Sequence, residues 1–317
     1  MRPAVRVADS SGLTIRRATE ADLSECHRVW REGINAYTIP MGAQPLQEDN
    51  PGVRRLHAHA LSTDPRRFLV AELSDSTGAS RVVAFGSAVE RGPLWFLSML
   101  FVEPAEQARG LGRALLERML PLPLEGRILA TCTDSAQPIS NGLYATLGIV
   151  PRLPMFNLIG RPRPDFAWPA LPSGITAERV ADPAMWRDSP ELTAFDQSVA
   201  GFAHPQDHLF IQDEPRHAFT FRDGGGSLVG YGYAGDIGRI GPIAVADQAL
   251  LTPVVGRLLH AIEPRGASAV WLSGASDDAI STAIQAGLRI EDAPILIGWS
   301  QPFADFARYV PVSPGLM

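Results

Sequence analysis

A loop with two glycines stands where a helix is expected to begin. Residues 107–112 read Gln-Ala-Arg-Gly-Leu-Gly. Glycine lets the backbone approach a ligand closely, and the first turn of a helix has free N–H groups and a positive dipole end. Such a loop is suited to a phosphate or diphosphate. It matches neither common nucleotide motif, because a Rossmann fingerprint needs glycine where Leu115 stands, and a P-loop needs a lysine, which the chain lacks.

The segments on either side of this loop would hold it in place. The apolar, aromatic-rich run 94–102 stops just before Pro104 and predicts a buried strand. After the loop, Leu111, Leu115 and Met119 recur about one turn apart and predict an amphipathic helix. A strand, a glycine-bearing turn and a helix together make an anion-binding arrangement.

The run 107–112 resembles the acetyl-CoA-binding motif of the GNAT acyltransferases, Gln/Arg-x-x-Gly-x-Gly/Ala. The spacing of Leu100, Val102 and Pro104 also matches the strand ending of that superfamily. The stretch 140–149 is similar to another of its elements, a helix that ends in glycine. The resemblance covers residues 14–160 and implies an α/β (α+β) fold, in the order β-α-α-β-β-β-α-β-α-β.

The resemblance also implies acetyl-CoA as the co-substrate and gives roles to individual residues. Main-chain N–H groups would hold the pyrophosphate, and they belong to Gln107, Ala108, Arg109, Gly110, Leu111 and Gly112. The strand residues Leu100, Phe101 and Val102 would lie along the pantetheine arm, with Asn141 beside it. Tyr144 would protonate the departing thiolate, or it is a core aromatic. Arg113 would add charge at the phosphates, or it is a solvated surface arginine.

The sequence does not identify a general base. Glu90, at the end of its predicted strand, and Ser98, on the central strand, are the nearest candidates, and an ordered water could serve instead. Residues 33–52 are predicted to be a loop. There the resemblance makes Tyr37 and Glu48 candidate contacts to the acceptor substrate, and the alternative is a loop without such a role. Ser98 on the central strand is also a candidate substrate contact.

The second half of the chain repeats the first in a degraded form. Segments 228–233, 241–245, 250–259 and 285–289 echo 82–87, 98–102, 107–116 and 146–149. Leu250, Pro253 and Val255 replace the residues of the CoA motif, so this half is not expected to bind CoA. The predicted division is a catalytic GNAT domain at 1–160, a proline-rich linker at 161–173 and a degenerate GNAT-like domain at 174–317. Each domain is expected to have a mixed, largely antiparallel sheet flanked by helices.

Composition narrows the class of protein. The 317 residues carry a net charge of −6, which argues against a nucleic-acid partner. No apolar run is long enough to span a membrane, and the two cysteines, Cys26 and Cys132, have no metal-ligand spacing. A cytoplasmic location is expected, with residues 1–12 as a flexible leader without a secretory signal.

The histidines are expected to be structural. His27, His57 and His59 are predicted on helix faces, the last two at the surface. His204, Asp207 and His208 could line a pocket or hold a metal. No spacing for a third ligand is evident, so we favour a capped helix with surface histidines and expect no metal.

These observations predict an acetyl-CoA-dependent N-acetyltransferase that acts on a primary amine of a small molecule by direct attack. The alternative is a protein without catalytic activity that binds acyl-CoA as a sensor or binds a partner. Neither the acceptor amine nor the oligomeric state follows from the sequence.

Overall fold

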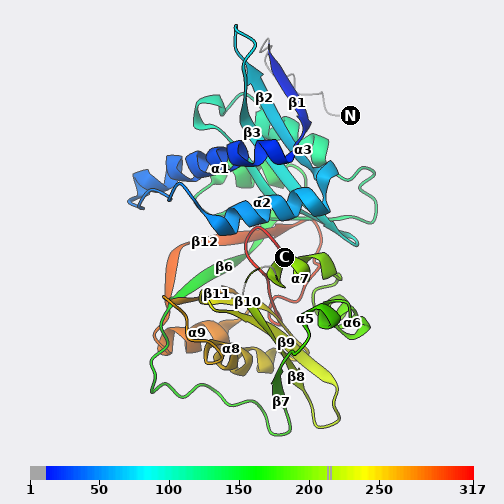
Figure 1. Ribbon diagram of the computed structural model, residues 1–317, viewed down its shortest axis with the longest axis vertical. Coiled ribbons are helices and arrows are strands. Elements are labelled where there is room, and N and C mark those ends of the chain that lie inside the picture. Colours follow the sequence, from blue (N-terminus) through cyan, green and yellow to red (C-terminus); the bar gives the residue numbers. More distant parts are fainter. Residues whose placement is uncertain (1–11, 213, 215) are drawn as a thin grey trace. The chain divides into compact units, whose positions relative to one another are not determined.

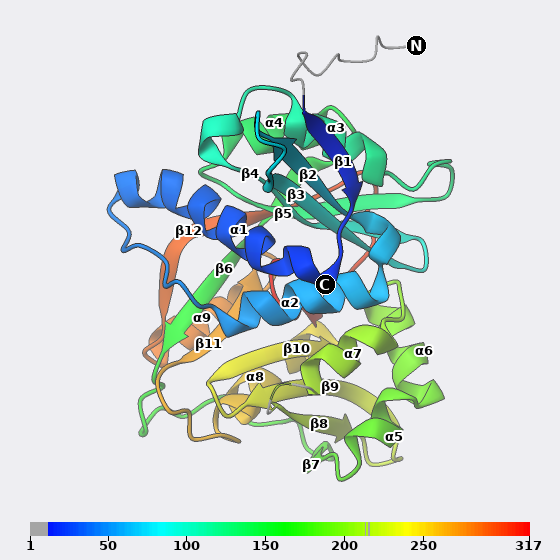
Figure 2. The ribbon, with the colours of Figure 1, turned by 45° about the horizontal axis from the view of Figure 1, so that its top comes forward.

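The computed structural model describes residues 12–212, 214 and 216–317, so all but the last residue of the predicted leader lies outside the described part. The chain forms two compact units. The first comprises residues 1–90 and 95–127, and the second comprises residues 91–94 and 128–317. Figures 1 and 2 show the elements of both units from two directions.

The first unit is a sheet with helices on both faces. Its strands lie in the order β1-β2-β3-β4, and β2 runs antiparallel to both β1 and β3. Helices α1 and α2 lie in front of the strands in Figure 1, and α3 lies behind them. The elements are β1 (Leu13–Arg17), α1 (Leu23–Thr38), α2 (Pro51–Thr63), β2 (Phe68–Ser74), β3 (Ser80–Arg91), β4 (Leu94–Val102) and α3 (Leu111–Met119).

Capping residues set the helix starts of this unit. Thr19 and Asp22 form a capping box around a short 3-10 turn that leads into α1, as their spacing predicts. The Asn50 side chain accepts a hydrogen bond from the Val53 N–H at the start of α2. The predicted strand at 94–102 is confirmed as β4, and the predicted amphipathic helix is α3.

Helix α1 extends into the segment predicted as a loop. It continues through Gly33 to Thr38, so the loop prediction for 33–52 is wrong at 33–38 and again at 51–52, where α2 has begun. A Cβ at Gly33 would lie 3.1 Å from the Phe101 ring, so this glycine allows close packing rather than ending the helix. The predicted surface positions of His57 and His59 are also wrong, because both side chains are buried.

The second unit contains an eight-stranded sheet in the order β5-β12-β6-β11-β10-β9-β8-β7, with a short strand β13 beside β10. Only β10 and β11 pair in parallel among the pairs in this sheet. The strands are β5 (Ile128–Asp134), β6 (Val150–Gly160), β7 (Thr176–Arg179), β8 (Arg216–Arg222), β9 (Leu228–Gly235), β10 (Arg239–Val245), β11 (Ser268–Ser273), β12 (Arg289–Trp299) and β13 (Tyr309–Val310). The helices are α4 (Pro138–Ala145), α5 (Pro183–Arg187), α6 (Pro190–Val199), α7 (Pro205–Gln212), α8 (Leu251–Leu259) and α9 (Asp277–Gln285).

The last strands of the two sequence repeats are exchanged. Strand β12 closes the second repeat in sequence, yet it pairs with β5 and β6 of the first. Strand β6 closes the first repeat, yet its other edge pairs with β11 of the second repeat. Each repeat therefore places its final strand between strands of the other.

This exchange explains why the compact units differ from the repeats. The division between the units falls at 127–128, whereas the sequence repeats divide near 160. Both β5 and β6 belong to the second unit because β12 lies between them. The assignment of a catalytic repeat at 1–160 and a degenerate repeat at 174–317 stays a prediction.

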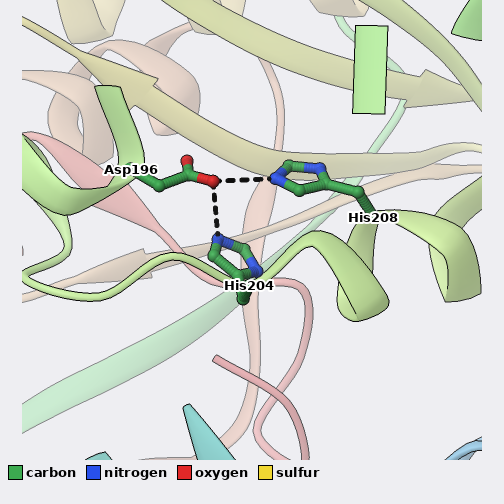
Figure 3. Close-up of side chains that lie close together, drawn as sticks. All are labelled: Asp196, His204 and His208. Atoms are coloured by element: carbon green, nitrogen blue, oxygen red, sulfur yellow. Dashed lines mark hydrogen bonds and ion pairs between the residues drawn. The ribbon is translucent and has the colours of Figure 1, made fainter. Parts of the chain in front are cut away.

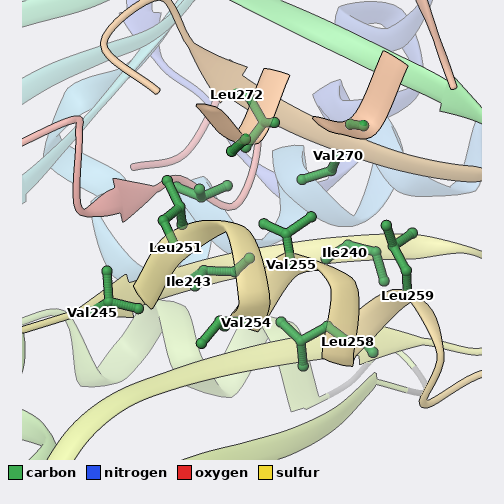
Figure 4. Close-up of a cluster of buried hydrophobic side chains, with 14 of the residues drawn as sticks. Ile240, Ile243, Val245, Leu251, Val254, Val255, Leu258, Leu259, Val270 and Leu272 are labelled. Carbon is green, nitrogen blue, oxygen red and sulfur yellow. The ribbon is translucent and has the colours of Figure 1, made fainter. Parts of the chain in front are cut away.

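A large apolar core fills the second repeat (Figure 4). Helix α8 packs its aliphatic side chains against strands β10 and β11. Almost every residue of this helix is buried, from Leu251 to Gly256 without interruption. The helix is thus a core element along its whole first turn, which bears on its ability to contact a ligand.

The proline-rich segment 161–173, predicted as a linker, makes specific contacts with the second repeat. The Arg163 N–H donates to the Ala286 carbonyl at 2.7 Å, and Trp168 packs against α8 at Gly256. A Cβ built at Gly256 would lie 2.7 Å from the indole ring. The segment is therefore packed on the second repeat.

We expect Gly256→Ala to destabilise the protein, because the added methyl overlaps the Trp168 ring and forces either the helix or the indole to move. Overpacking of this kind costs about 1–3 kcal/mol. Urea unfolding followed by tryptophan fluorescence measures the loss. Gly266→Ala is the control, since no atom lies within 4 Å of a Cβ there; equal stability of the two variants would contradict the packing role.

No helix in the described part of the chain is long and apolar enough to cross a membrane.

Candidate functional site

The loop between β4 and α3 has the backbone shape of an anion site. Gly110 precedes α3 with φ of +82°, and Ala108 also has a positive φ of +62°. Nothing lies within 4 Å of a Cβ built at Gly110, so the left-handed conformation rather than crowding calls for glycine there. These two left-handed residues turn the chain just before the helix begins.

The N–H groups of this loop are available to a ligand. From Ala108 to Arg113, no backbone N–H has an acceptor among the described residues; the first helical bond runs from the Ala114 N–H to the Gly110 carbonyl at 3.0 Å. Unpaired N–H groups at a helix start carry the positive end of the helix dipole. The group of donors therefore fits a diphosphate.

The side chains of β4 alternate between the two helix layers near the loop. Atoms of Leu100 and Val102 lie 4.0 and 3.7 Å from a Cβ built at Gly112, on the α3 side. Phe101 instead packs against Gly33 of α1. The contacts at Gly112 are ordinary van der Waals distances, so alanine would fit there, as the GNAT pattern allows.

Gln107 ties the loop to the end of β4. Its Nε2 donates to the Val102 carbonyl at 3.1 Å. Main chain at Val102 is expected to lie along the pantetheine arm. A carbonyl has a second lone pair, so this bond leaves room for another donor. Gln107 therefore has a positioning role in addition to the predicted N–H contact.

Arginines neutralise the acidic residues around the loop. Glu103 accepts from Arg28 at 2.9 Å and also pairs with Arg81. Burial raises the pKa of Glu103, but the two guanidinium groups outweigh that effect and lower it below its usual value. Glu106 is buried and pairs with Arg109 at 2.6 Å. The loop therefore presents few uncompensated negative charges to an anionic ligand.

The remaining predicted residues of this unit already have partners. The Glu90 carboxylate accepts from Arg67 Nε at 2.7 Å, so it is not a free base. Ser98 is buried on β4, and Tyr37 is half-buried on α1 rather than on a loop. Arg113 lies 3.9 Å from Glu117 along α3, and Glu48 is exposed.

Two predicted residues belong to the second unit and lie on α4. Tyr144 is buried, and burial raises the pKa of its phenol well above the usual range, although a hydrogen bond with Ser140 acts in the opposite sense. Asn141 Nδ2 donates to the carbonyls of Asp134 and Gln137 at 3.1 and 2.9 Å. Tyr144 therefore stays protonated at neutral pH, and the Asn141 amide binds its own helix start.

The start of α8 in the second repeat corresponds to the start of α3, but it is poorly suited to an anion. The Asp247 carboxylate accepts from the Ala249 N–H at 2.9 Å and places a negative charge before α8. Pro253 has no N–H to offer, and Val255 is fully buried. These features support the prediction that this repeat does not bind CoA.

The structure also brings together a cluster that the sequence analysis did not assemble. Asp196, His204 and His208 are all buried, so the expectation of surface histidines is wrong. The spacing of the two histidines, four residues apart, was visible in the sequence. The third member lies eight residues earlier on another helix, where no local pattern indicates it.

Comparison with known proteins agrees with this geometry. Residues 30–149 match the family model described as the acetyltransferase (GNAT) family. No curated protein matches the sequence.

Several solved structures share the fold. A predicted acetyltransferase of Pyrococcus horikoshii is 15% identical, with 97% of this chain and 96% of that chain covered and a TM-score of 0.72. A GCN5-related N-acetyltransferase of Sphaerobacter thermophilus is 14% identical, with 93% and 98% covered and a TM-score of 0.59.

A tandem GNAT protein from the clavulanic acid biosynthesis pathway is 17% identical, with 92% and 99% covered and a TM-score of 0.54. The region 30–149 therefore belongs to the acetyltransferase (GNAT) family, and the chain has the fold of tandem GNAT proteins.

Proposed function

We propose that the protein is an acetyl-CoA-dependent N-acetyltransferase that acetylates a primary amine of a small molecule. The observation that carries this proposal is the series of backbone N–H groups around the left-handed Gly110. From Ala108 to Arg113 these groups have no acceptor among the described residues. The family match over 30–149 supports an acyl-CoA donor. A cytoplasmic location remains our prediction from the sequence.

In the proposed reaction the amine attacks the thioester carbonyl directly, with both reactants bound. N–H groups of the 107–112 loop bind the pyrophosphate, and main chain at Leu100 and Val102 pairs with the pantetheine arm. Tyr144 donates a proton to the departing thiolate, and solvent takes the proton that leaves the attacking nitrogen and returns one to Tyr144. The roles of Tyr144 and of Asn141, which belong to the second unit, rest on the sequence resemblance.

A second function is favoured by one observation. The Glu90 carboxylate, one of the base candidates, is engaged by Arg67 at 2.7 Å. A protein that binds acyl-CoA without transferring the acyl group would have this arrangement. An amine that binds partly neutral needs little help from a base, so we retain the transferase as the main proposal.

Thiol release separates the two functions. Purified protein is incubated with acetyl-CoA and a panel of small primary amines, and free CoA is measured with a thiol reagent. A transferase releases thiol in proportion to one or more amines, and mass spectrometry finds the acetylated amine. Saturable acetyl-CoA binding without amine-dependent thiol release would support the non-catalytic alternative.

We expect Gly110→Ala to weaken acetyl-CoA binding about tenfold or more. The added Cβ makes φ of +82° cost roughly 1–2 kcal/mol, so the loop populates its left-handed conformation less often. Isothermal titration measures the affinity and the stoichiometry, which should be one acetyl-CoA per chain.

Gly78→Ala is the matched control, because Gly78 has φ of +86° and the same open surroundings in a turn of the same unit. It should be destabilised to a similar extent but should bind acetyl-CoA normally. Equal loss of affinity in both variants would show that general destabilisation, rather than the loop, explains the effect.

A further inference from the structure

A carboxylate and two imidazoles meet inside the second repeat (Figure 3). Asp196 comes from the last turn of α6, His208 from α7, and His204 from the residue just before α7. Asp196 Oδ2 lies 3.0 Å from His208 Nε2 and 3.6 Å from His204 Nε2. All three side chains have at most 1% of their surface exposed. Three atoms that can ligate a metal therefore face one another in a buried site.

His204 lacks hydrogen-bond partners although it is fully buried. Neither of its ring nitrogens has a hydrogen bond within the described residues. Its Nε2 points at Asp196 Oδ2 but lies too far away for a hydrogen bond (Figure 3). An unpartnered buried polar group is costly, and each such group in a native fold calls for an explanation. A ligand between these atoms would provide one.

The charges of the cluster leave one carboxylate without a matching cation. Asp207 makes a two-pronged ion pair with Arg91, at 2.6 and 2.7 Å, and both side chains are buried. Among the described residues, Asp196 has ion-pair contacts only with the two imidazoles. A divalent cation would compensate the Asp196 charge.

The distances match those of a tetrahedral ion. Zinc bonds to nitrogen and oxygen of about 2.0–2.1 Å place neighbouring ligand atoms about 3.3 Å apart. The two distances to Asp196 Oδ2, 3.0 and 3.6 Å, bracket this value. One ligand atom from each of the three residues lies within 4.8 Å of the others. Small side-chain movements would therefore complete the coordination.

Further side chains orient the three groups as outer partners of metal ligands do. The Tyr231 hydroxyl donates to Asp196 Oδ1 at 2.6 Å, and the Tyr233 hydroxyl lies 2.9 Å from His208 Nδ1. His204 Nδ1 faces Asp207 Oδ2 at 3.7 Å. The atoms not needed for coordination are thus held on the outer side of the cluster.

We propose that Asp196 Oδ2, His204 Nε2 and His208 Nε2 bind a divalent transition metal ion, with zinc as the best match to a carboxylate and two imidazoles. A solvent molecule takes the fourth position. The ion connects α6 to α7 and stabilises the second repeat, independently of acyl-CoA binding in the first unit. The competing explanation is a metal-free hydrogen-bond network.

The test uses the full-length protein, stripped with a chelator and dialysed, then titrated with zinc chloride. We expect about one zinc per chain by elemental analysis and a higher melting temperature in zinc than in chelator. Cobalt substitution should give the visible absorption typical of tetrahedral sites. His208→Asn and Asp196→Asn should each lose the stoichiometric metal.

Two further variants keep the test decisive if those proteins fold poorly. Tyr233→Phe removes only an orienting hydroxyl and should weaken zinc binding about 10–100-fold. His217→Ala removes a histidine outside the cluster, paired with Asp236, and should bind zinc normally. Absence of stoichiometric metal from the wild type, or binding unchanged by Asp196→Asn, His208→Asn and Tyr233→Phe, would overturn the proposal.

Discussion

A chain that ends after Gly160 is expected to lose its native fold, although it contains every residue of the first sequence repeat. Strand β12 lies between β5 and β6 and pairs with both. Without residues 161–317, the facing edges of β5 and β6 present unpaired N–H and C=O groups, which favour aggregation. Far-UV circular dichroism, thermal melting and size-exclusion chromatography of the 1–160 fragment measure this loss.

The complementary fragment 161–317 should fail for the reciprocal reason, because it lacks β6 between β12 and β11. Co-expression of the two fragments is the control. It restores every strand pair and should give a soluble complex that melts cooperatively. A monomeric 1–160 fragment with native-like dichroism and a cooperative melt would show that the exchanged strand is dispensable.

The second large effect is expected from Tyr144→Phe in the proposed transferase. A positioned general acid contributes about 10²–10⁴-fold to rate, so kcat should fall at least about a hundredfold. The KM for acetyl-CoA should change little, because the hydroxyl acts on the leaving thiolate. Steady-state thiol release with the best amine of the panel measures both parameters.

The pH profile adds a separate check on Tyr144. Burial raises the phenol pKa above its usual value of about 10, so the phenol remains protonated throughout the pH range 6–9. Loss of the acid would begin only above that range, and Tyr144 should cause no alkaline fall in rate between pH 7 and 9. Tyr309→Phe is the control, because it removes another fully buried hydroxyl. An unaltered rate in Tyr144→Phe would exclude this residue from the chemistry.

Local sequence patterns were sufficient for the elements that hold the 107–112 loop. The bounds of β4 and α3 follow from an apolar run, a proline and two glycines, and all of these act within a few residues of the chain. Gly33 led to the wrong prediction of a loop at 33–38, because its role depends on a distant residue. Its lack of a side chain serves packing against Phe101, a distant residue, so the local rule that glycine ends helices did not apply.

The strand exchange could not be read from the sequence. Strands β6 and β12 have similar lengths and positions in their repeats, and the pattern of a strand does not state which neighbour it pairs with. The repeat itself was visible, because segments 228–233, 241–245, 250–259 and 285–289 echo segments of the first half. Topology depends on contacts between distant segments, which a periodic pattern does not record.

The cluster of Asp196, His204 and His208 likewise depends on contacts between distant segments, so the sequence did not predict it. His204 and His208 are close in sequence, but their burial depends on strand β9, which supplies Tyr231 and Tyr233, and on Arg91 far along the chain. A polar composition suggested a surface helix. The paired charges and hydroxyls that make burial tolerable come from other elements, so only the three-dimensional fold reveals the group.

Exchange of the closing strands also constrains how such a duplicated gene can change over time. The second repeat has Leu250, Pro253 and Val255 at the positions aligned with the CoA motif, and these side chains are buried in its own core. It cannot be deleted, since its strand at 289–299 completes the partner copy. Each half is thereby a scaffold for the other, so we expect the second repeat to be required for folding although it is predicted not to bind CoA.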